Sequence, residues 1–303
     1  MTSDSLDQRL PATRADRVPR GIYYMLIATV LFAASSAISK WQVAGYSFAE
    51  VLFWRSASSL VICALLILPR TGLAVFRTQR LRDHAGRNLT QGTAQACIVI
   101  AFSLMPLAGA VAINFSAPLV ATVVAAVLLK EQVGAMRWGA LLIGFFGVLI
   151  VATPGADSFR IGALFAVVNA VLYGSVTAAV RGMTATESTE TLTMYQMMFL
   201  FAFFALLLPV GFAWPRPDDL LVMLLSGVFY GFGQYTWTRS LSLAPTSAVG
   251  PFYYFSLVWA IALGFLFWGD VPTLPLLAGS AIVVGSGLFL LWHEAGKRPL
   301  PSD

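Results

Sequence analysis

The chain has 303 residues, of which 58% are hydrophobic and only 11% charged, with a net charge of +5 and a mean hydropathy of +0.78. Soluble proteins are about 25% charged, because their outer surface must be largely polar, so this composition excludes a soluble globular domain. It also excludes a disordered chain, since disordered chains are poor in aromatic residues and rich in charge. The sequence therefore predicts an integral membrane protein.

Ten apolar runs follow one another along the chain. Each is close to the roughly 20 residues that a helix needs to cross a bilayer, and none alternates in polarity as the strands of a membrane barrel do. The first five predicted spans are 22–40, 48–68, 88–105, 108–129 and 137–153. The second five are 159–181, 191–212, 218–241, 246–268 and 273–292. The predicted fold class is an all-α integral membrane protein with ten transmembrane helices.

The ends of the chain and the loop charges predict the orientation. Residues 1–21 are polar and carry four arginines, without the short apolar run and cleavage site of a signal peptide, so we expect a flexible cytoplasmic tail there and another at 293–303. With the N-terminus inside, the inner side holds fifteen Lys and Arg residues and the outer side three. Because positive residues accumulate on the cytoplasmic side, both termini are predicted to face the cytoplasm, in a bacterial inner membrane.

Tryptophans lie close to several of the predicted span ends. Trp and Tyr are enriched where a membrane protein meets the headgroup region, because their rings are apolar and carry a polar edge. The residues concerned are Trp41, Trp138, Trp214, Trp268 and Trp292. They are expected to form an aromatic belt at the two membrane surfaces.

The two halves of the chain resemble each other at a spacing that drifts from 138 to 140 residues. A turn proline recurs as Pro106 and Pro245, and an acid at a span end recurs as Glu131 and Asp270. The glycines Gly139 and Gly147 match Gly279 and Gly287. The predicted repeats are 22–153 and 159–292. Since each holds an odd number of spans, the second copy is expected to be inverted, as in many secondary transporters whose substrate site lies near the membrane midplane.

These motifs resemble the ten-helix, EamA-like branch of the drug/metabolite transporter superfamily. The resemblance rests on Pro118, on Leu-Leu-Lys130-Glu131 and on the glycine pairs of both copies. Ser256 stands where a proline is expected in the second copy, although Pro251 could supply a kink nearby. Within this branch the chain looks most like bacterial aromatic amino-acid exporters. The resemblance implies a secondary transporter that exports aromatic or other neutral amino acids by alternating access.

Polar side chains recur at helical spacing inside the predicted spans, where a polar group without a partner is costly. We expect the first, third, fourth, sixth, eighth and ninth spans to line a cavity that hydrogen-bonds and stacks on a substrate. The candidate substrate-binding residues are Ser35, Ser39, Gln91, Gln95, Asn114, Asn169, Tyr173, Tyr230, Gln234, Trp237, Tyr253 and Trp259. Each polar side chain could instead join helices to one another, as Ser, Asn and Gln commonly do in membranes.

Four further residues are candidates for gating or electrostatic roles. Arg55 lies about two turns into the second span, and a charge at a helix centre costs about 2.5–3.5 kcal/mol. It could pair with Glu50 or reach the membrane surface, or else attract a substrate carboxylate or set a gate. Lys40, at the outer end of the first span, leaves the same alternatives open. Pro118 and Pro251 could act as pivots or as static kinks.

Some chemistries find no support in the sequence. No Asp or Glu lies far from the end of a predicted span, so we expect either uniport or coupling through another group. No Gly-x-x-x-x-Gly-Lys loop is present, which argues against ATP-driven transport. The two histidines lie outside the spans, and the cysteines form no metal pattern. We therefore expect no cofactor and no enzyme activity, with a channel or scaffold as a different class of function.

The expected partners are a small-molecule substrate, such as an amino acid or similar metabolite, and the lipid bilayer, with no nucleic acid. The alternatives to amino-acid export are uptake of a vitamin or nucleoside-like metabolite, or export of drugs. The sequence leaves open both a monomer and a weak homodimer.

Overall fold

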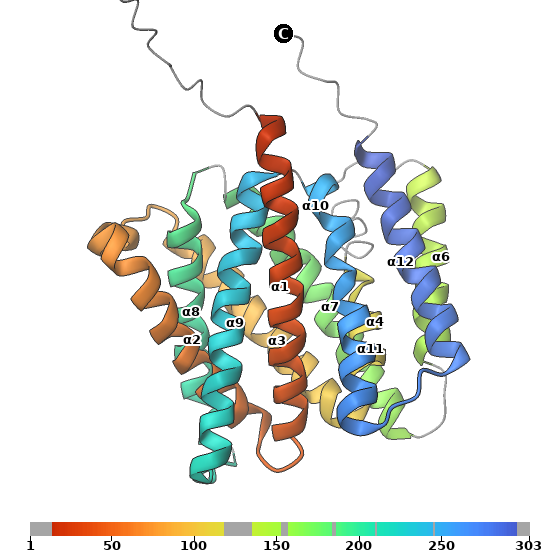
Figure 1. Cartoon of the computed structure of the whole chain (residues 1–303), viewed down its shortest axis with the longest axis horizontal. Coiled ribbons are helices and arrows are strands. Elements are labelled where there is room, and N and C mark those ends of the chain that lie inside the picture. The colour runs from red at the N-terminus through yellow and green to blue at the C-terminus, as the bar shows by residue number, and fades with distance from the viewer. Residues whose placement is uncertain are drawn as a thin grey trace, which may run out of the picture.

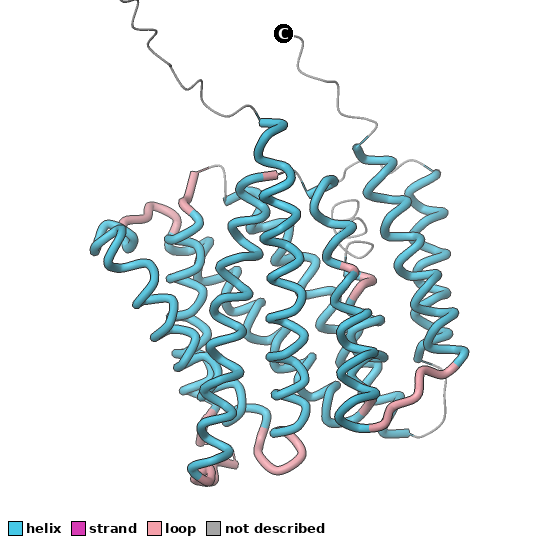
Figure 2. The backbone as a smooth tube through the Cα atoms, in the orientation of Figure 1, coloured by secondary structure: helices cyan, strands magenta, loops and turns pink. Residues whose placement is uncertain are grey.

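The computed structural model describes residues 14–117, 135–152, 157–183, 186–209, 211–244 and 246–295. Throughout these ranges the regular elements are helices, joined by short loops at the two ends of a bundle (Figure 1, Figure 2). The first helix, α1 (Arg14–Gln42), begins at the same end of the bundle at which the last, α12 (Leu274–Ala295), finishes (Figure 1). The prediction of an all-α fold is confirmed.

The first half of the chain follows the predicted spans. After α1 come α2 (Phe48–Thr71), the 3-10 helix η1 (Gly72–Phe76), α3 (Leu81–Leu104), α4 (Leu107–Asn114) and α6 (Ala135–Ala152). Helix α3 begins several residues before the predicted span, because its first two turns are polar and lie beyond the apolar run that defined the prediction. The rest of the predicted fourth span, with Pro118, lies outside the described residues.

The second half contains one helix break that the sequence did not predict. Its elements are α7 (Asp157–Met183), α8 (Thr189–Leu207), α9 (Pro217–Leu243), α10 (Thr246–Tyr253), α11 (Phe255–Trp268) and α12. The ninth span, expected as one continuous helix over 246–268, is divided at Tyr254 into α10 and α11. Pro251 lies in α10, three residues before this break; a proline disturbs the turn that precedes it, so Pro251 does not account for the break at Tyr254.

The break at Tyr254 has a counterpart in the first half. There, α4 ends at Asn114 and a turn follows at Phe115 and Ser116. The centroids of the Phe115 and Tyr254 rings lie 4.9 Å apart. The two breaks occupy corresponding positions in the two copies and meet in the interior of the bundle.

Local sequence explains where several helices begin and end. The hydroxyl of Ser47 accepts a hydrogen bond from the backbone N–H of Glu50 at 3.2 Å, and Ser188 accepts one from Thr191 at 3.0 Å. Each serine thus satisfies an N–H group that the first turn of its helix leaves free. Helix α11 ends at Gly269, whose φ of +67° is left-handed and suits glycine.

The helices pack with the symmetry expected of inverted repeats. Helices α1 and α2 pack against α9, while α7 and α8 pack against α3. Helix α4 packs against α11, and α6 packs against α12 at one edge of the bundle (Figure 1). Because α1, α2 and α3 correspond to α7, α8 and α9, exchanging the two copies reproduces the contacts of α1 and α2 with α9 and of α7 and α8 with α3. The fold is therefore two interlocked, inverted repeats.

Glycines permit the closest of these approaches. A Cβ at Gly227 would collide with the backbone carbonyl of Arg55, and a Cβ at Gly231 would lie 2.7 Å from Ile62. The hydroxyl of Ser59 donates to the carbonyl oxygen of Gly227 at 2.7 Å. This Gly-x-x-x-Gly motif therefore joins α2 to α9 within the chain, as small residues do between membrane helices.

The outer surface is apolar. Four described stretches are long and apolar enough to cross a membrane: Val18–Gln42, Phe48–Phe76, Arg160–Thr177 and Thr189–Leu207. Helices α3 and α9 are not among them, and these two carry several of the polar candidate residues. Large apolar side chains such as Leu142, Phe146 and Leu266 are exposed, and Trp41, Trp138, Trp214 and Trp292 are exposed near helix ends. This surface suits lipid along the helices and a headgroup region at their ends.

Candidate functional site

A polar cavity of about 120 Å³ lies inside the bundle. Its walls come from α1, α2, α3 and α4 of the first copy and from α7, α9, α10 and α11 of the second. The polar wall residues are Ser36, Arg55, Gln91, Gln95, Asn114, Asn169, Tyr173, Tyr230, Gln234, Tyr253 and Ser256. Phe32, Ile98 and Phe102 contribute apolar surface. The cavity thus offers amides, phenols, one guanidinium and apolar contacts, which is the mixture that small-molecule sites use.

All of the amide and tyrosine candidates line this cavity. They are Gln91, Gln95, Asn114, Asn169, Tyr173, Tyr230, Gln234 and Tyr253. Asn169 donates to the side-chain oxygen of Asn114 at 2.6 Å. This pair connects α7 to α4, so helices of both copies meet around one cavity.

The serine candidates lie elsewhere. The hydroxyl of Ser35 is 3.0 Å from that of Ser226 on α9, and Ser39 donates to the carbonyl oxygen of Ser35 at 2.8 Å. Both residues therefore join α1 to α9, and it is Ser36 that faces the cavity. One residue turns a helix by about 100°, so a neighbouring serine reaches a different surface.

The two tryptophan candidates also lie outside the cavity wall. Trp237 is buried against Met25 and Ala28, with its ring centroid 6.4 Å from that of Tyr173. Trp259 is partly exposed, and its indole N–H lies 3.3 Å from the Thr29 hydroxyl. Neither ring presents a free face to the cavity.

Lys40 closes the end of a neighbouring helix. Its ammonium group donates to the carbonyl oxygens of Phe102 and Met105 at 3.1 and 2.9 Å, and lies 5.3 Å from the centroid of the Trp268 ring. A cation at the C-terminal end of a helix satisfies carbonyl groups that the helix leaves free. Lys40 therefore binds the end of α3 and does not line the cavity. For Pro251 only the backbone is described, within α10, and Pro118 is outside the described residues.

Arg55 reaches into the cavity and forms part of a network inside the membrane. It donates to the side-chain oxygen of Gln95, and the amide nitrogen of Gln95 donates to the Tyr230 hydroxyl. The guanidinium carbon lies 4.6 Å from the centroid of the Tyr230 ring. A second bond joins Arg55 to the Ser39 hydroxyl at 3.4 Å. Four helices, α1, α2, α3 and α9, are thereby linked through one arginine.

The expected pairing of Arg55 with Glu50 is not formed. Glu50 is fully buried near the start of α2, and its carboxylate accepts from the backbone N–H of Ala213 at 3.3 Å. The two side chains lie five residues apart, which places them on different faces of α2. Nor does Arg55 reach the membrane surface, since it is only 5% exposed.

Two further buried polar residues, Arg87 and Gln196, escape prediction from the sequence. Arg87 is 5% exposed and donates to the side-chain oxygen of Gln196 at 3.1 Å and to the carbonyl oxygen of Leu192 at 3.2 Å. It lies just before the predicted third span, where an arginine is expected to be in water. Gln196 is a single amide in an otherwise apolar stretch of α8, and this isolation is the signal that could have identified it.

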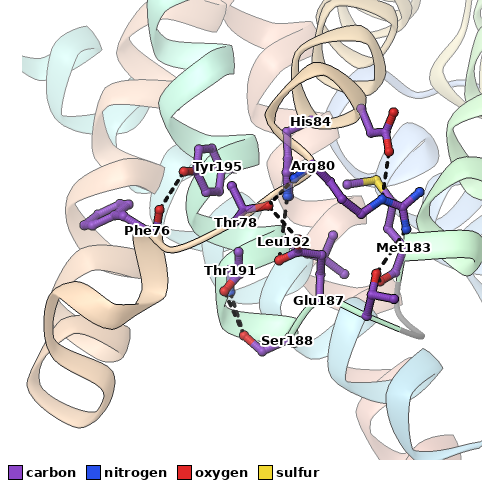
Figure 3. A network of polar contacts seen from close by, with 12 residues as sticks. Phe76, Thr78, Arg80, His84, Met183, Glu187, Ser188, Thr191, Leu192 and Tyr195 are labelled. Atoms are coloured by element: carbon purple, nitrogen blue, oxygen red, sulfur yellow. Dashed lines mark hydrogen bonds and ion pairs between the residues drawn. The ribbon is translucent and has the colours of Figure 1, made fainter.

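At the end of the bundle that carries the chain ends, the α2–α3 connection is bound to the α7–α8 connection (Figure 3). Thr78 donates to Glu187 at 2.6 Å, and Arg80 donates to Thr186 at 3.0 Å. His84, expected in a loop, lies in the first turn of α3, fully buried and stacked on Tyr195 with 4.5 Å between centroids. These contacts join a connection of the first copy to a connection of the second.

The comparisons with known proteins place this architecture in a family. The chain matches the EamA-like transporter family over residues 19–153 and again over residues 160–292. This chain belongs to the EamA-like transporter family. The two matches correspond to the two sets of helices that pack as inverted copies. The protein is thus a multi-pass membrane transporter by family, and the names of its relatives are those of transporters rather than of enzymes.

Several relatives match along nearly their whole length. The chain is 28% identical over 300 residues to a riboflavin transporter of Rhizobium johnstonii, covering 98% of this chain and 99% of the relative. It is 29% identical to a riboflavin transporter of Vibrio cholerae, covering 92% and 95%. It is 25% identical to a pseudopaline exporter of Pseudomonas aeruginosa, covering 89% and 95%. The narrower resemblance to aromatic amino-acid exporters finds no support in these names.

A solved structure shares the fold. It covers 92% of this chain and 99% of its own, with a TM-score of 0.66 and 19% sequence identity. At this identity the likeness concerns the arrangement of the helices and carries nothing about a substrate.

Proposed function

We propose that this chain is a secondary transporter that carries riboflavin, or a vitamin of similar chemistry, through the cavity between its two repeats. The observation that carries the proposal is a polar, partly aromatic cavity enclosed by both copies, in a chain whose relatives along nearly its whole length include two riboflavin transporters. Amino-acid export, which the motifs first suggested, is the alternative within the same family.

The chemistry of the cavity suits such a solute. Riboflavin has a planar ring system, an imide edge with both donors and acceptors, and a chain of hydroxyl groups. The amides of Gln91, Gln234 and Asn169 can serve as donor or acceptor, while Phe32 and Phe102 offer apolar faces. A site built to hydrogen-bond its substrate rejects analogues that lack the matching groups, so selectivity would come from the amides and phenols.

Movement would follow from the helix breaks. Sites for small molecules usually measure about 300–1,000 Å³, so a cavity of about 120 Å³ must widen to hold a vitamin. The break at Tyr254, which lies against Phe115 inside the bundle, would allow α10 and α11 to tilt separately. Rocking of one copy against the other would then open the cavity to one side of the membrane at a time.

The energy source follows from the charges of the cavity. Within the described part of the chain, its wall contains no carboxylate, so the carboxylate relay of many proton-coupled carriers has no counterpart there. We propose transport down the concentration gradient of the solute. We propose that both termini face the cytoplasm, because this orientation puts the excess of Lys and Arg on the inner side.

Purified protein in liposomes tests the function directly. We expect uptake of radiolabelled riboflavin that saturates and that unlabelled riboflavin inhibits, whereas a channel would show neither behaviour. Replacing Gln234 by alanine is expected to raise KM roughly threefold to tenfold, because one hydrogen bond is worth about 0.5–1.5 kcal/mol. Thr90→Ala is the matched control, because Thr90 bonds to the Gly86 carbonyl of its own helix, away from the cavity.

A parallel measurement with radiolabelled phenylalanine separates the two substrate classes. Riboflavin uptake no faster than into empty liposomes, together with saturable phenylalanine flux, would reject the vitamin and favour the amino acid. Unchanged KM in Gln234→Ala would remove this residue from the site.

A further inference from the structure

Two arginines are buried inside the bundle, and neither has an acidic partner in the described part of the chain. Arg55 and Arg87 are each 5% exposed. The ion pairs among the described residues join Arg80 to Asp83 and His84 to Glu187, and neither includes a buried arginine. A buried charge without a partner is strongly unfavourable. The protein must therefore compensate these two charges with dipoles or with a charge that a ligand brings.

One arginine is linked through a glutamine to Tyr230. Gln95 accepts from Arg55 with its side-chain oxygen and donates to the Tyr230 hydroxyl with its nitrogen. Gln196 accepts from Arg87 at 3.1 Å, so each buried arginine is bound to a glutamine side chain. The chain that begins at Arg55 runs through α2 and α3 and ends at the Tyr230 hydroxyl on α9.

This chain decides what the Tyr230 hydroxyl can do. Its oxygen accepts from the Gln95 amide, and no hydrogen bond in the described part of the chain uses its own proton. That proton is therefore available to a ligand, and aligned hydrogen bonds strengthen one another in a medium of low dielectric constant. Tyr230 is therefore a polarised donor, placed at the midpoint of α9 and in the wall of the cavity.

Arg55 adds a full positive charge beside this donor. Its bonds to Gln95 and Ser39 leave further N–H groups of the guanidinium without an acceptor among the described residues. It is also the charged member of the described cavity wall. The centroid of the Tyr230 ring and the guanidinium carbon of Arg55 lie 4.6 Å apart. The hydroxyl donor and the cation together form a centre for a negatively charged or strongly electron-rich oxygen.

We propose that the cavity selects its ligand by such an oxygen, a carboxylate or an imide-type carbonyl, bound between the Tyr230 hydroxyl and the Arg55 guanidinium, and that it rejects cations. Gln95 is a positioning residue that orients Tyr230. This inference rests on the proposed function, since it names the chemistry of the same cavity. It does not depend on riboflavin itself, because any solute with this group fits.

Three probes of nearly equal shape test the charge preference. Indole-3-acetate, indole-3-acetamide and tryptamine carry a negative, a neutral and a positive group on one ring system. We expect calorimetric titration of the purified full-length protein to show the acid binding at least about tenfold more tightly than the amine, since hydrogen bonds to charged groups are the stronger ones, with the amide between them. Equal or tighter binding of the amine would overturn the proposal.

Variants of Arg55 and Tyr230 test whether these two residues cause the preference for the acid over the amine. Arg55→Gln and Tyr230→Phe should each reduce the ratio of acid to amine affinity by about tenfold, and Arg55→Lys should retain part of it. Arg80→Gln, which removes an arginine bound to Thr186 and Asp83 at the end of the bundle, is the matched control and should leave the ratio unchanged. An unaltered ratio in folded Tyr230→Phe would reject the centre even if Arg55→Gln does not fold.

The outcome separates this inference from the proposed substrate. If riboflavin is not transported but the acid is still preferred over the amine, the vitamin proposal fails and the charge centre stands. If riboflavin is transported and the probes show no charge preference, the centre fails and the vitamin proposal stands.

Discussion

Side chains of the same type have different roles in this bundle, and the angular position of each on its helix decides its role. Ser35 bonds to Ser226 and joins two helices, whereas Ser36, the next residue, faces the cavity. Helical spacing correctly grouped the amides and tyrosines but not the serines. Serine is small enough to fit either against a neighbouring helix or at a cavity wall, so its type does not reveal its surroundings.

His84 makes a prediction for pH dependence. Burial, with the positive charges of Arg87 and Arg80, lowers the pKa of its imidazole, although Glu187 and Asp83 act in the opposite direction. A histidine whose pKa is lower in the folded protein takes up protons more readily when unfolded. Its contribution to stability is therefore complete above the ordinary pKa of about 6.5 and is lost as the pH falls from that value through the lower pKa of the folded protein.

Thermal unfolding in detergent between pH 7.5 and 5.5 measures this contribution. We expect the wild-type Tm to fall more over this interval than that of His84→Phe, which retains an aromatic ring against Tyr195 without a titrating group. Equal pH dependence in the two proteins would show that His84 does not control this end of the bundle.

At the scale of elements, close helix packing positions the charged residue of the cavity. Gly227 of α9 touches the backbone of α2 at Arg55 itself, so the crossing of these helices fixes the depth of the guanidinium. Sequence revealed the Gly-x-x-x-Gly motif but not its partner, because two small residues on one face permit an approach without specifying the other helix. Contact with α2 was decided by the tertiary fold.

Replacing Gly227 by alanine tests this coupling. The new methyl group would meet backbone, which cannot rotate away, and overpacking typically costs about 1–3 kcal/mol. We expect a lower Tm together with slower riboflavin transport, because α2 must shift and carry Arg55 with it. Gly86→Ala is the control, since Gly86 is in the exposed start of α3 with no neighbour near its missing Cβ. Transport and Tm as in the wild type for Gly227→Ala would contradict the role of this crossing.

At the scale of the whole molecule, the inverted copies explain both the enclosed cavity and the shared end for the two termini.

Cysteine labelling in intact cells tests the orientation. Gly45, in the α1–α2 loop, and Leu73, in η1, are exposed at opposite ends of the bundle, while Cys63 and Cys97 are buried. We expect a membrane-impermeant maleimide to label Gly45→Cys and not Leu73→Cys until the membrane is permeabilised. The reverse pattern would place the termini outside.

The sequence by itself determined the membrane class, the all-helical fold and the repeat. These features depend on composition, on the length of apolar runs and on motifs recurring along the chain, all of which are local or periodic. It also grouped amides and tyrosines that line one cavity in the structure, since a polar group in a span needs a partner or a cavity.

Only the tertiary structure decided which polar groups meet. The division of the ninth span at Tyr254, the partnership of Arg55 with Gln95 rather than Glu50, and the place of Arg87 beside Gln196 all depend on contacts between helices distant in the chain. The energy of a buried polar group depends on every neighbour that reaches it. Spacing along one helix does not reveal those neighbours, because they are brought together only when the two inverted copies pack against each other.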